Sequence, residues 1–249
     1  FDRPLTAPEL AALRELVKRR QAGESVAYIV GKKEFFGLEL AVDARVLVPR
    51  PDTETLVDEA LARLPLPPPA PAPEPSSADV PPPPKIADVG TGSGAIAIAI
   101  ATQRPGARVF ASDISADALV VAQENATRRG CDITFVAGDL DAPLVALGPF
   151  HVIAANLPYI PTADLAGLPP EVKAEPALAL DGGPDGLDLV RRLVAAAPSL
   201  LVPQGALVLE VGAGQAQPTA TLLQQAGFVD IRLRRDLGST ERVVSGLKP

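Results

Sequence analysis

The sequence lacks methionine and tryptophan altogether and contains one cysteine, Cys131, and one histidine, His151. A single cysteine excludes a disulfide framework and a cysteine-built zinc site. A single histidine excludes a metal centre of several histidines and argues against a serine-histidine-aspartate triad. No apolar run reaches the ~18 residues of a membrane span, and no basic-then-apolar leader opens the chain. We therefore expect no metal and no membrane, in a cytoplasmic protein or, if a leader has been removed, an organellar matrix protein.

Composition and charge favour an acidic globular protein. The chain has 249 residues, of which 47% are hydrophobic and 21% charged, with a net charge of −7. This is enough for one large core with a small appendage and excludes disorder throughout. Residues 1–50 carry 9 basic and 7 acidic side chains, and the remainder carries 14 and 23, so the main body has a net charge of −9. Such a body is a poor general binder of phosphate backbones, which makes nucleic acid an unfavoured partner.

Proline is abundant, with 28 residues, and 11 of them fall between Pro65 and Pro84. This segment has no apolar period and few backbone donors for a regular ladder of hydrogen bonds. We predict a surface insertion over residues 65–84 within a larger domain; a ligand for a proline-binding domain is the less favoured alternative.

The first fifty residues contain a helix signal followed by a hairpin signal. Thr6 and Glu9 have the spacing of a capping box, and an apolar stripe follows, which predicts a helix from about residue 6 to 20. Residues 36–42 alternate between apolar and other side chains, as a half-buried strand does. We expect residues 46–48 to form a second strand that pairs with it.

After residue 84 the chain alternates between short apolar runs and longer helical patterns. Strands are expected at 86–89, 108–112, 133–137, 152–155, 206–211, 229–233 and 243–245, with helices at 94–103, 116–129, 187–201 and 215–226. This alternation predicts an α/β fold with a parallel, helix-covered sheet. A ligand is expected at the carboxyl ends of the strands, near the point where the strand order reverses.

A glycine-rich loop joins the first of these strands to its helix, with the sequence Asp88-Val89-Gly90-Thr91-Gly92-Ser93-Gly94. Glycines let the backbone approach a ligand closely, and the helix that follows offers unpaired N–H groups. Asp113 ends the next strand, 23 residues after Gly90, where a carboxylate accepts hydrogen bonds from ribose hydroxyls. These residues predict a site for an adenosine-bearing cofactor.

The glycine spacing alone leaves the cofactor open, because Gly90, Gly92 and Ala95 also satisfy the dinucleotide fingerprint of a nicotinamide-dependent dehydrogenase. Asp88 favours S-adenosylmethionine, since a carboxylate attracts a cationic amino-acid group and repels a pyrophosphate. A dehydrogenase would also need a proton-relay residue, and His151, at a strand start, is expected to be structural. A tight turn in a degenerate binding module would explain one glycine, but not three with two placed acids.

The strand at 152–155 ends in Asn156-Leu157-Pro158-Tyr159. An amide or aryl-amine NH₂ is a poor nucleophile, so a site that methylates it must hold both hydrogens and aim the nitrogen. An asparagine side-chain oxygen and a backbone carbonyl beside proline supply two acceptors, and a tyrosine ring supplies a flat face. Orientation of this kind lowers a barrier without an acid or a base. In isolation the motif would be a turn; at this strand, after the glycine loop, we interpret it as a substrate site.

These motifs, with others along the chain, resemble the release-factor glutamine methyltransferases, the HemK/PrmC family. The further segments are Gly23-Glu24-Ser25-Val26-Ala27-Tyr28, Glu34-Phe35-Phe36-Gly37, Val48-Pro49-Arg50-Pro51-Asp52-Thr53-Glu54, Glu175-Pro176-Ala177-Leu178-Ala179-Leu180-Asp181-Gly182-Gly183 and Asp185-Gly186-Leu187. Each segment alone is weak, and the set is specific.

The resemblance implies a class I S-adenosylmethionine-dependent methyltransferase fold, Rossmann-like, with a mostly parallel seven-stranded sheet and helices on both faces. It implies a remnant of a helical N-terminal substrate-docking domain at residues 1–30, a β-hairpin linker at 31–50 and a methyltransferase domain at 51–249. The implied reaction moves a methyl group from S-adenosylmethionine to the side-chain amide nitrogen (N5) of the glutamine in the Gly-Gly-Gln motif of peptide-chain release factors. The products are S-adenosylhomocysteine and a methylated release factor.

The resemblance also assigns site residues. The cofactor would be held by Asp88, Gly90, Thr91, Gly92, Ser93, Gly94, Asp113, Leu140 and Asn156. The glutamine would be held by Asn156, Leu157, Pro158 and Tyr159, with Asn156, Pro158 and Tyr159 as the catalytic residues. The stretch from Arg50 to Glu54 would close over the cleft, and Glu210 and Gln215 are expected to be structural.

One departure from the family pattern opens an alternative. The family element is usually Asn-Pro-Pro-Tyr, whereas Asn-Leu-Pro-Tyr is the form found in rRNA adenine dimethylases. Adenine N6 is also a planar amine, so an rRNA or DNA adenine-N6 methyltransferase is the alternative function. The acidic body and the family-like segments on both sides of the site favour the release factor.

Overall fold

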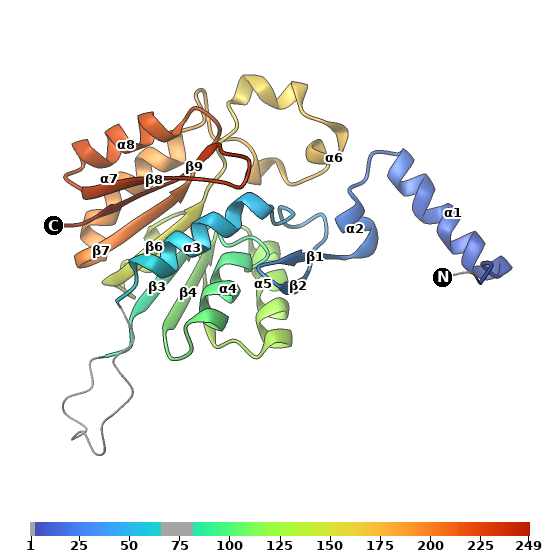
Figure 1. The fold of residues 1–249 in the computed structure, drawn as a ribbon, viewed down its shortest axis with the longest axis horizontal. Helices are drawn as coiled ribbons and strands as arrows, with labels where there is room; N and C mark the ends of the chain where they lie inside the picture. Colours follow the sequence, from blue (N-terminus) through green and yellow to red (C-terminus); the bar gives the residue numbers. More distant parts are fainter. Residues whose placement is uncertain (1–2, 66–81) are drawn as a thin grey trace, which may run out of the picture.

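The main part of the structure, a computed structural model that describes residues 3–65 and 82–249, is a seven-stranded sheet flanked by helices (Figure 1). Its strands are β3 (Lys85–Val89), β4 (Arg108–Asp113), β5 (Ile133–Ala137), β6 (Phe150–Asn156), β7 (Leu201–Glu210), β8 (Val229–Arg235) and β9 (Glu241–Leu247). The helices packed against it are α3 (Glu54–Arg63), α4 (Ala95–Gln103), α5 (Ala116–Arg129), α7 (Asp188–Leu200) and α8 (Ala216–Gln225). The predicted insertion at 65–84 lies almost entirely outside the described residues.

The strand order is β5-β4-β3-β6-β7-β9-β8, and the sheet is parallel from β5 to β7. The last two strands join antiparallel to β7 and to each other. The strand order reverses between β3 and β6, where Val89 pairs with Ala155, so the loops after these two strands diverge and leave a crevice at their carboxyl ends. The predicted α/β fold class is confirmed.

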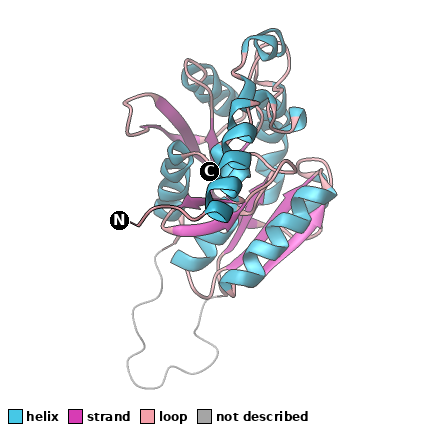
Figure 2. Ribbon diagram, turned by 90° about the vertical axis from the view of Figure 1, so that its right-hand side faces the viewer, coloured by secondary structure: helices cyan, strands magenta, loops and turns pink. Residues whose placement is uncertain are grey.

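Two apolar cores lie on opposite faces of this sheet. One is built on α7 and α8, and the other on α3 and α4. Figure 2 shows helices on both sides of the strands. Residues 95–100 of α4 are buried on every side because the helix packs against α3 and α5 as well as the sheet, which explains why this helix carries no polar stripe. Among the described residues, no helix has the length and apolarity to cross a bilayer.

The N-terminal elements are α1 (Ala7–Gln21), α2 (Val26–Val30) and a two-stranded sheet of β1 (Lys32–Phe35) and β2 (Leu38–Ala41). The predicted capping box of α1 is present, with the Thr6 N–H donating to Glu9 Oε2 over 2.8 Å. No residue of α1 is buried. Figure 1 shows α1 standing away from the sheet beyond α2, and Arg20 forms an ion pair with Glu171 of the short helix α6 (Pro170–Lys173).

The predicted strand at residues 46–48 is wrong, and so is its pairing with residues 36–42. The hairpin partner of β2 is β1, across a two-residue turn in which Phe36 and Gly37 both have positive φ, at 52° and 71°. Such a turn matches the twist of a hairpin. Val46 and Val48 are buried because they pack on Tyr28 and α5, so their alternation reflects burial of a loop.

Short helical turns complete the connections around the sheet. They are η1 (Pro51–Thr53), η2 (Ala142–Leu144), η3 (Thr162–Gly167) and η4 (Ala177–Ala179). The first and last of these flank the crevice.

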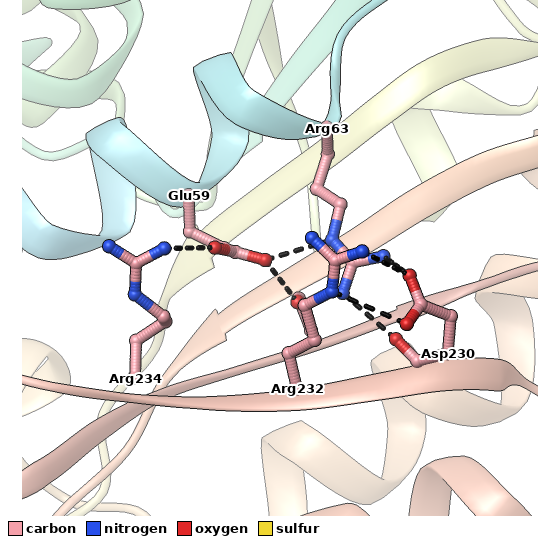
Figure 3. Close-up of polar contacts among 6 residues, drawn as sticks. Glu59, Arg63, Asp230, Arg232 and Arg234 are labelled. Atoms are coloured by element: carbon pink, nitrogen blue, oxygen red, sulfur yellow. Dashed lines mark hydrogen bonds and ion pairs between the residues drawn. The ribbon is translucent and has the colours of Figure 1, made fainter.

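A buried ion network joins α3 to the antiparallel edge of the sheet (Figure 3). Glu59 is fully buried, and its carboxylate contacts Arg63 at 2.8 Å and Arg234 at 3.1 Å. Ser245 also donates a hydrogen bond to it at 2.7 Å. The Arg63 side chain is 3% exposed and pairs in turn with Asp230 at 2.7 Å. The network therefore compensates a charge that would otherwise be costly to bury.

Removing Arg63 should be far more damaging than removing Arg234. Arg63→Ala leaves the Glu59 carboxylate buried with a weaker partner, so we expect it to lower the free energy of unfolding by about 3–5 kcal/mol. The side chain of Arg234 is 49% exposed, so Arg234→Ala is the matched control and should lose only a fraction of that. Urea unfolding followed by circular dichroism measures both, and equal losses would contradict the assignment.

Candidate functional site

The glycine loop after β3 takes a left-handed course at three positions. The φ angles of Gly90, Gly92 and Gly94 are 73°, 54° and 83°. A Cβ on Gly94 would lie 3.2 Å from Ala122 Cβ, so this glycine lets α4 pack closely on α5. A Cβ on Gly92 would meet no atom within 4 Å, so the backbone here faces open space. The loop therefore has one glycine for packing and one that exposes its backbone.

Asp88 lies beneath this loop. Its side chain is fully buried, with Oδ2 accepting from the Thr91 hydroxyl at 2.6 Å and from the Ala97 N–H at 3.1 Å. Burial raises the pKa of Asp88 to about 7, against the lowering effect of these two hydrogen bonds, and Asp113 raises it further. The contacts show that Asp88 fastens the loop to the first turn of α4. Asp88 does not line the cavity at the carboxyl ends of the strands, and its buried Oδ1 has no hydrogen-bond partner, so its attraction for a cationic ligand stays a prediction.

A cavity of about 320 Å³ lies at the carboxyl ends of β3, β4, β5 and β6, where the strand order reverses, and is called the main cavity because most of the predicted site residues line it. Seven predicted site residues line it, from the carboxyl ends of four strands, β3 to β6: Gly90, Gly92, Asp113, Leu140, Asn156, Leu157 and Pro158. Five others do not line it: Asp88, Thr91, Ser93, Gly94 and Tyr159. The structure thus brings the glycine loop, the acid after β4 and the asparagine after β6 to one cavity.

Asp113 is held in place by backbone donors on both sides. The Gly92 N–H donates to Oδ2 at 2.9 Å, and the Ser115 N–H donates to Oδ1 at 2.9 Å. Each carboxylate oxygen keeps a further acceptor position. Leu140, with a φ of 48° and 8% exposure, gives the cavity an apolar wall next to this acid. An acceptor pair beside an apolar wall suits a ribose joined to a flat base.

Sequence reasoning assigned no site role to another part of the cavity wall. Leu178 and Ala179 of η4 and Leu189 of α7 line it. At its rim Arg192 pairs with Asp139 at 2.6 Å. Leu178 is an exposed large apolar side chain, and it lies in the segment from Glu175 to Gly183 that carries part of the family resemblance.

Asn156 ends β6, Leu157 follows it, and both line the cavity with the glycine loop. A Cβ on Gly90 would lie 3.3 Å from Leu157 Cδ2, so Leu157 packs on the loop and fills the corner. Asn156 Nδ2 donates to Thr53 Oγ1 over 3.2 Å. Pro158 continues the cavity wall, and a Cβ on Gly182 would lie only 2.6 Å from its carbonyl oxygen. The glycine at 182 is therefore required for the loop to pass this close.

Tyr159 borders a second cavity, of about 570 Å³, that lies beside the first and is also lined by Gly212 and Arg242. Burial raises the pKa of the Tyr159 hydroxyl, and the neighbouring Glu210 carboxyl raises it further. Gln215 donates to the Tyr159 carbonyl over 2.9 Å and accepts from the Gly212 N–H at 2.8 Å. Gln215 is therefore structural, as predicted.

The segment from Arg50 to Glu54 is tied to four separate parts of the molecule. Arg50 pairs with the buried Glu175 at 2.6 Å, and Asp52 lies 3.7 Å from Arg242. Thr53 accepts from Asn156 at 3.2 Å, and Glu54 accepts from the Phe36 N–H at 2.8 Å. These bonds hold the segment against the Asn156 end of the cavity, so four of its residues have individual contacts that sequence alone left unassigned.

The comparisons with known proteins agree with this geometry. A model of a methyltransferase domain matches residues 86–174, and one of the PrmC N-terminal domain matches residues 1–31. A solved methyltransferase from Pyrococcus furiosus superposes with a TM-score of 0.60 at 16% identity, covering 98% of this chain and 99% of that one. A 16S rRNA N2 G1207 methyltransferase from T. thermophilus, solved with AdoMet and guanosine, gives a TM-score of 0.58 at 17% identity, over 88% and 50% of the two chains. Both confirm the class I methyltransferase fold.

The sequence relatives are more specific. A release factor glutamine methyltransferase of Geobacter sulfurreducens is 44% identical over 99% of this chain and 81% of its own length. Those of Rhodospirillum rubrum and Burkholderia pseudomallei are 42% and 41% identical, over 97% and 100% of this chain and 70% and 84% of their own. Matches of this extent, joined to the cavity geometry, show that the chain belongs to the release factor glutamine methyltransferase family.

Proposed function

We propose that this protein transfers a methyl group from S-adenosylmethionine to the side-chain amide nitrogen of the glutamine in the Gly-Gly-Gln motif of peptide-chain release factors. The observation that carries the proposal is the single cavity in which Asp113 and Gly92 meet Asn156 and Pro158. Relatives that match almost the whole chain are named for this reaction. We propose that the enzyme acts where translation takes place, in the cytoplasm or, if a leader has been removed, in an organellar matrix.

The residues around the cavity suit an S-adenosyl ligand. Asp113 offers acceptors for ribose hydroxyls, and Leu140 offers an apolar face for the adenine. The open approach to the Gly92 backbone leaves space for the amino-acid portion, whose methyl group sits on a positively charged sulfur. When bound, S-adenosylmethionine supplies this electrophilic methyl group.

The Asn156 segment suits a carboxamide. The Asn156 side-chain oxygen and the backbone carbonyl beside Pro158 accept the two hydrogens of the glutamine NH₂ and so direct its nitrogen toward the cavity. Tyr159 contributes an aromatic ring to the wall of the second cavity. As the new N–C bond forms and the C–S bond breaks, the amide nitrogen releases one proton to water, so no side chain needs to act as a base. The rate then depends on orientation.

The other functions that the sequence left open are not favoured. An adenine-N6 methyltransferase was suggested by Asn-Leu-Pro-Tyr, yet the relatives that match at 37–46% identity are named for release factors. A dehydrogenase was suggested by the glycine spacing, but the methyltransferase domain model covers the glycine loop and Asp113. Leu157 in place of a proline is accommodated, because its side chain packs on Gly90 and the proposed acceptors are untouched.

The substrate can be identified directly. Incubating purified release factor with this protein and S-adenosylmethionine should add one methyl group to the glutamine of the Gly-Gly-Gln peptide, read by tandem mass spectrometry. Ribosomal RNA under the same conditions, with methyl-labelled cofactor, is the matched control. Label in the RNA with an unmodified release factor would overturn the proposal.

Substitutions at the two ends of the cavity should affect methyl transfer and cofactor affinity differently. Asn156→Ala should abolish methyl transfer while leaving the affinity for S-adenosylhomocysteine nearly unchanged, because Asn156 acts mainly on the glutamine. Asp113→Ala should weaken that affinity by about 1–3 kcal/mol, since it removes charge-assisted bonds to the ribose. Isothermal titration calorimetry measures the affinity for S-adenosylhomocysteine, and the mass spectrometry assay measures methyl transfer.

Asp113→Asn is the control for loop disorder. It keeps one side-chain oxygen for a backbone N–H but loses the charge, so its affinity should fall between those of wild type and Asp113→Ala. An unchanged affinity in Asp113→Ala would remove Asp113 from the cofactor site, and a joint loss of affinity and transfer in Asn156→Ala would remove the assigned role of Asn156.

A further inference from the structure

Asn156 forms a polar cluster with two side chains that do not line the main cavity, Thr53 and Glu210. Asn156 and Glu210 end the parallel strands β6 and β7 and are paired in register, so their side chains lie on the same face of the sheet. Thr53 of η1 covers this end. Glu210 is 2% exposed and Thr53 4%, and neither lines the main cavity, whereas Asn156 does.

The contacts of the cluster involve the nitrogen end of the Asn156 amide. Nδ2 donates to Thr53 Oγ1 over 3.2 Å. The Glu210 carboxyl group lies next to Asn156 across the strand pair, Asn156 and Thr53 both lower its pKa, and its buried Oε2 has no hydrogen-bond partner. Because Nδ2 is turned toward Thr53, Oδ1 is the amide atom left for the cavity. This is the atom that the proposed reaction needs as an acceptor.

Only Glu210 can distinguish the two ends of the amide. The Thr53 hydroxyl both donates and accepts, so it tolerates either orientation of Asn156. An ionised carboxylate only accepts, so it attracts Nδ2 and repels Oδ1. If Asn156 turned over, its NH₂ would face the NH₂ of a bound glutamine, and the two donors could not pair.

We infer that Glu210 is a positioning residue of the methyl-transfer site, which holds the Asn156 amide with its oxygen toward the substrate, with Thr53 as the second anchor. The inference rests on the proposed function. It gives a role to a buried acid at the end of a mostly apolar strand. Glu210 does not line the main cavity, so it has no direct contact to make there.

Several charged groups surround Glu210. Burial raises the pKa of Glu210 to about 7, and Asp52 raises it as well, while Thr53, Arg242 and Asn156 lower it. The Tyr159 hydroxyl also faces this carboxyl group. Arg242 of β9 is anchored by Asp236 at 3.3 Å and lies 3.7 Å from Asp52. A protonated Glu210 can donate to Oδ1, so the orientation of Asn156 is fixed only when Glu210 is ionised.

A spectroscopic test reads this orientation without the reaction. In ¹⁵N-labelled protein, the Asn156 side-chain amide signal is identified by its loss in Asn156→Ala. We expect its proton shifts to titrate with a midpoint near 7, the pKa of Glu210, and to become independent of pH in Glu210→Gln. The same titration persisting in Glu210→Gln would overturn the inference.

A kinetic test measures the consequence. A hydrogen bond to a charged group changes the ratio of the two Asn156 amide orientations by roughly tenfold or more. The kcat of Glu210→Gln with release factor should therefore fall about tenfold at pH 8. The dissociation constant of S-adenosylhomocysteine should stay within about twofold, because Glu210 does not line the cavity. A wild-type kcat, or a loss of cofactor affinity equal to the loss of kcat, would contradict a positioning role.

Thr53 provides matched variants. Thr53→Val removes the hydroxyl at constant shape, and Thr53→Ser keeps it, so kcat should fall several-fold more in the first than in the second. Glu210→Gln has nearly the shape of the native residue, and an unchanged circular dichroism spectrum confirms its fold. If the wild-type enzyme left release factor unmodified while the Asn156 signal behaved as expected, the proposed function would fail and the positioning of Asn156 would stand.

Discussion

The whole site depends on the parallel pairing of β3 with β6. Pairing of Val89 with Ala155 places the next residues, Gly90 and Asn156, at the same height above the sheet. A side chain at position 90 would press on Leu157 and would have to adopt a φ of 73°, which only glycine does without strain. The glycine loop and the asparagine segment share one cavity because position 90 has no side chain that would separate them.

Around this junction the protein buries several carboxylates where segments far apart in the sequence meet. Glu59 joins α3 to β8 and β9, Glu175 joins the segment between α6 and η4 to Arg50, and Glu210 of β7 lies beside Asn156 of β6. A buried charge is expensive unless its partners are in place, so each of these contacts penalises any other docking of the same segments. Such acids contribute less to stability than an apolar core does. Their main effect is to favour one arrangement of these segments over the alternatives.

Much of the fold could be predicted from the sequence, because buried parallel strands are continuous apolar runs separated by helices. The hairpin was placed wrongly because alternation at Val46 and Val48 has the same appearance whether the residues pair in a strand or pack from a loop. Asp88 was expected in the cavity because its sequence neighbours are there. Adjacent strand residues point to opposite faces, and its side chain faces α4.

The site residues that sequence reasoning found are those in local motifs, such as Gly92, Asp113 and Asn156. Thr53 and Glu210 were missed as partners of Asn156 because the contact joins three distant segments. Glu210 carried one signal, an acid that ends an apolar strand. Only the observed register of β6 and β7 shows that Glu210 is a neighbour of Asn156.

The isolation of α1 has a consequence for how the molecule opens. Its fifteen residues bury no side chain, so the helix is held by its own hydrogen bonds, its cap and a few surface ion pairs. A helix of this length without packing is marginal in water, whereas α4 is enclosed on all sides. Amide hydrogens of α1 will therefore exchange with deuterium through local fraying, long before those of α4, which exchange only when the sheet itself comes apart.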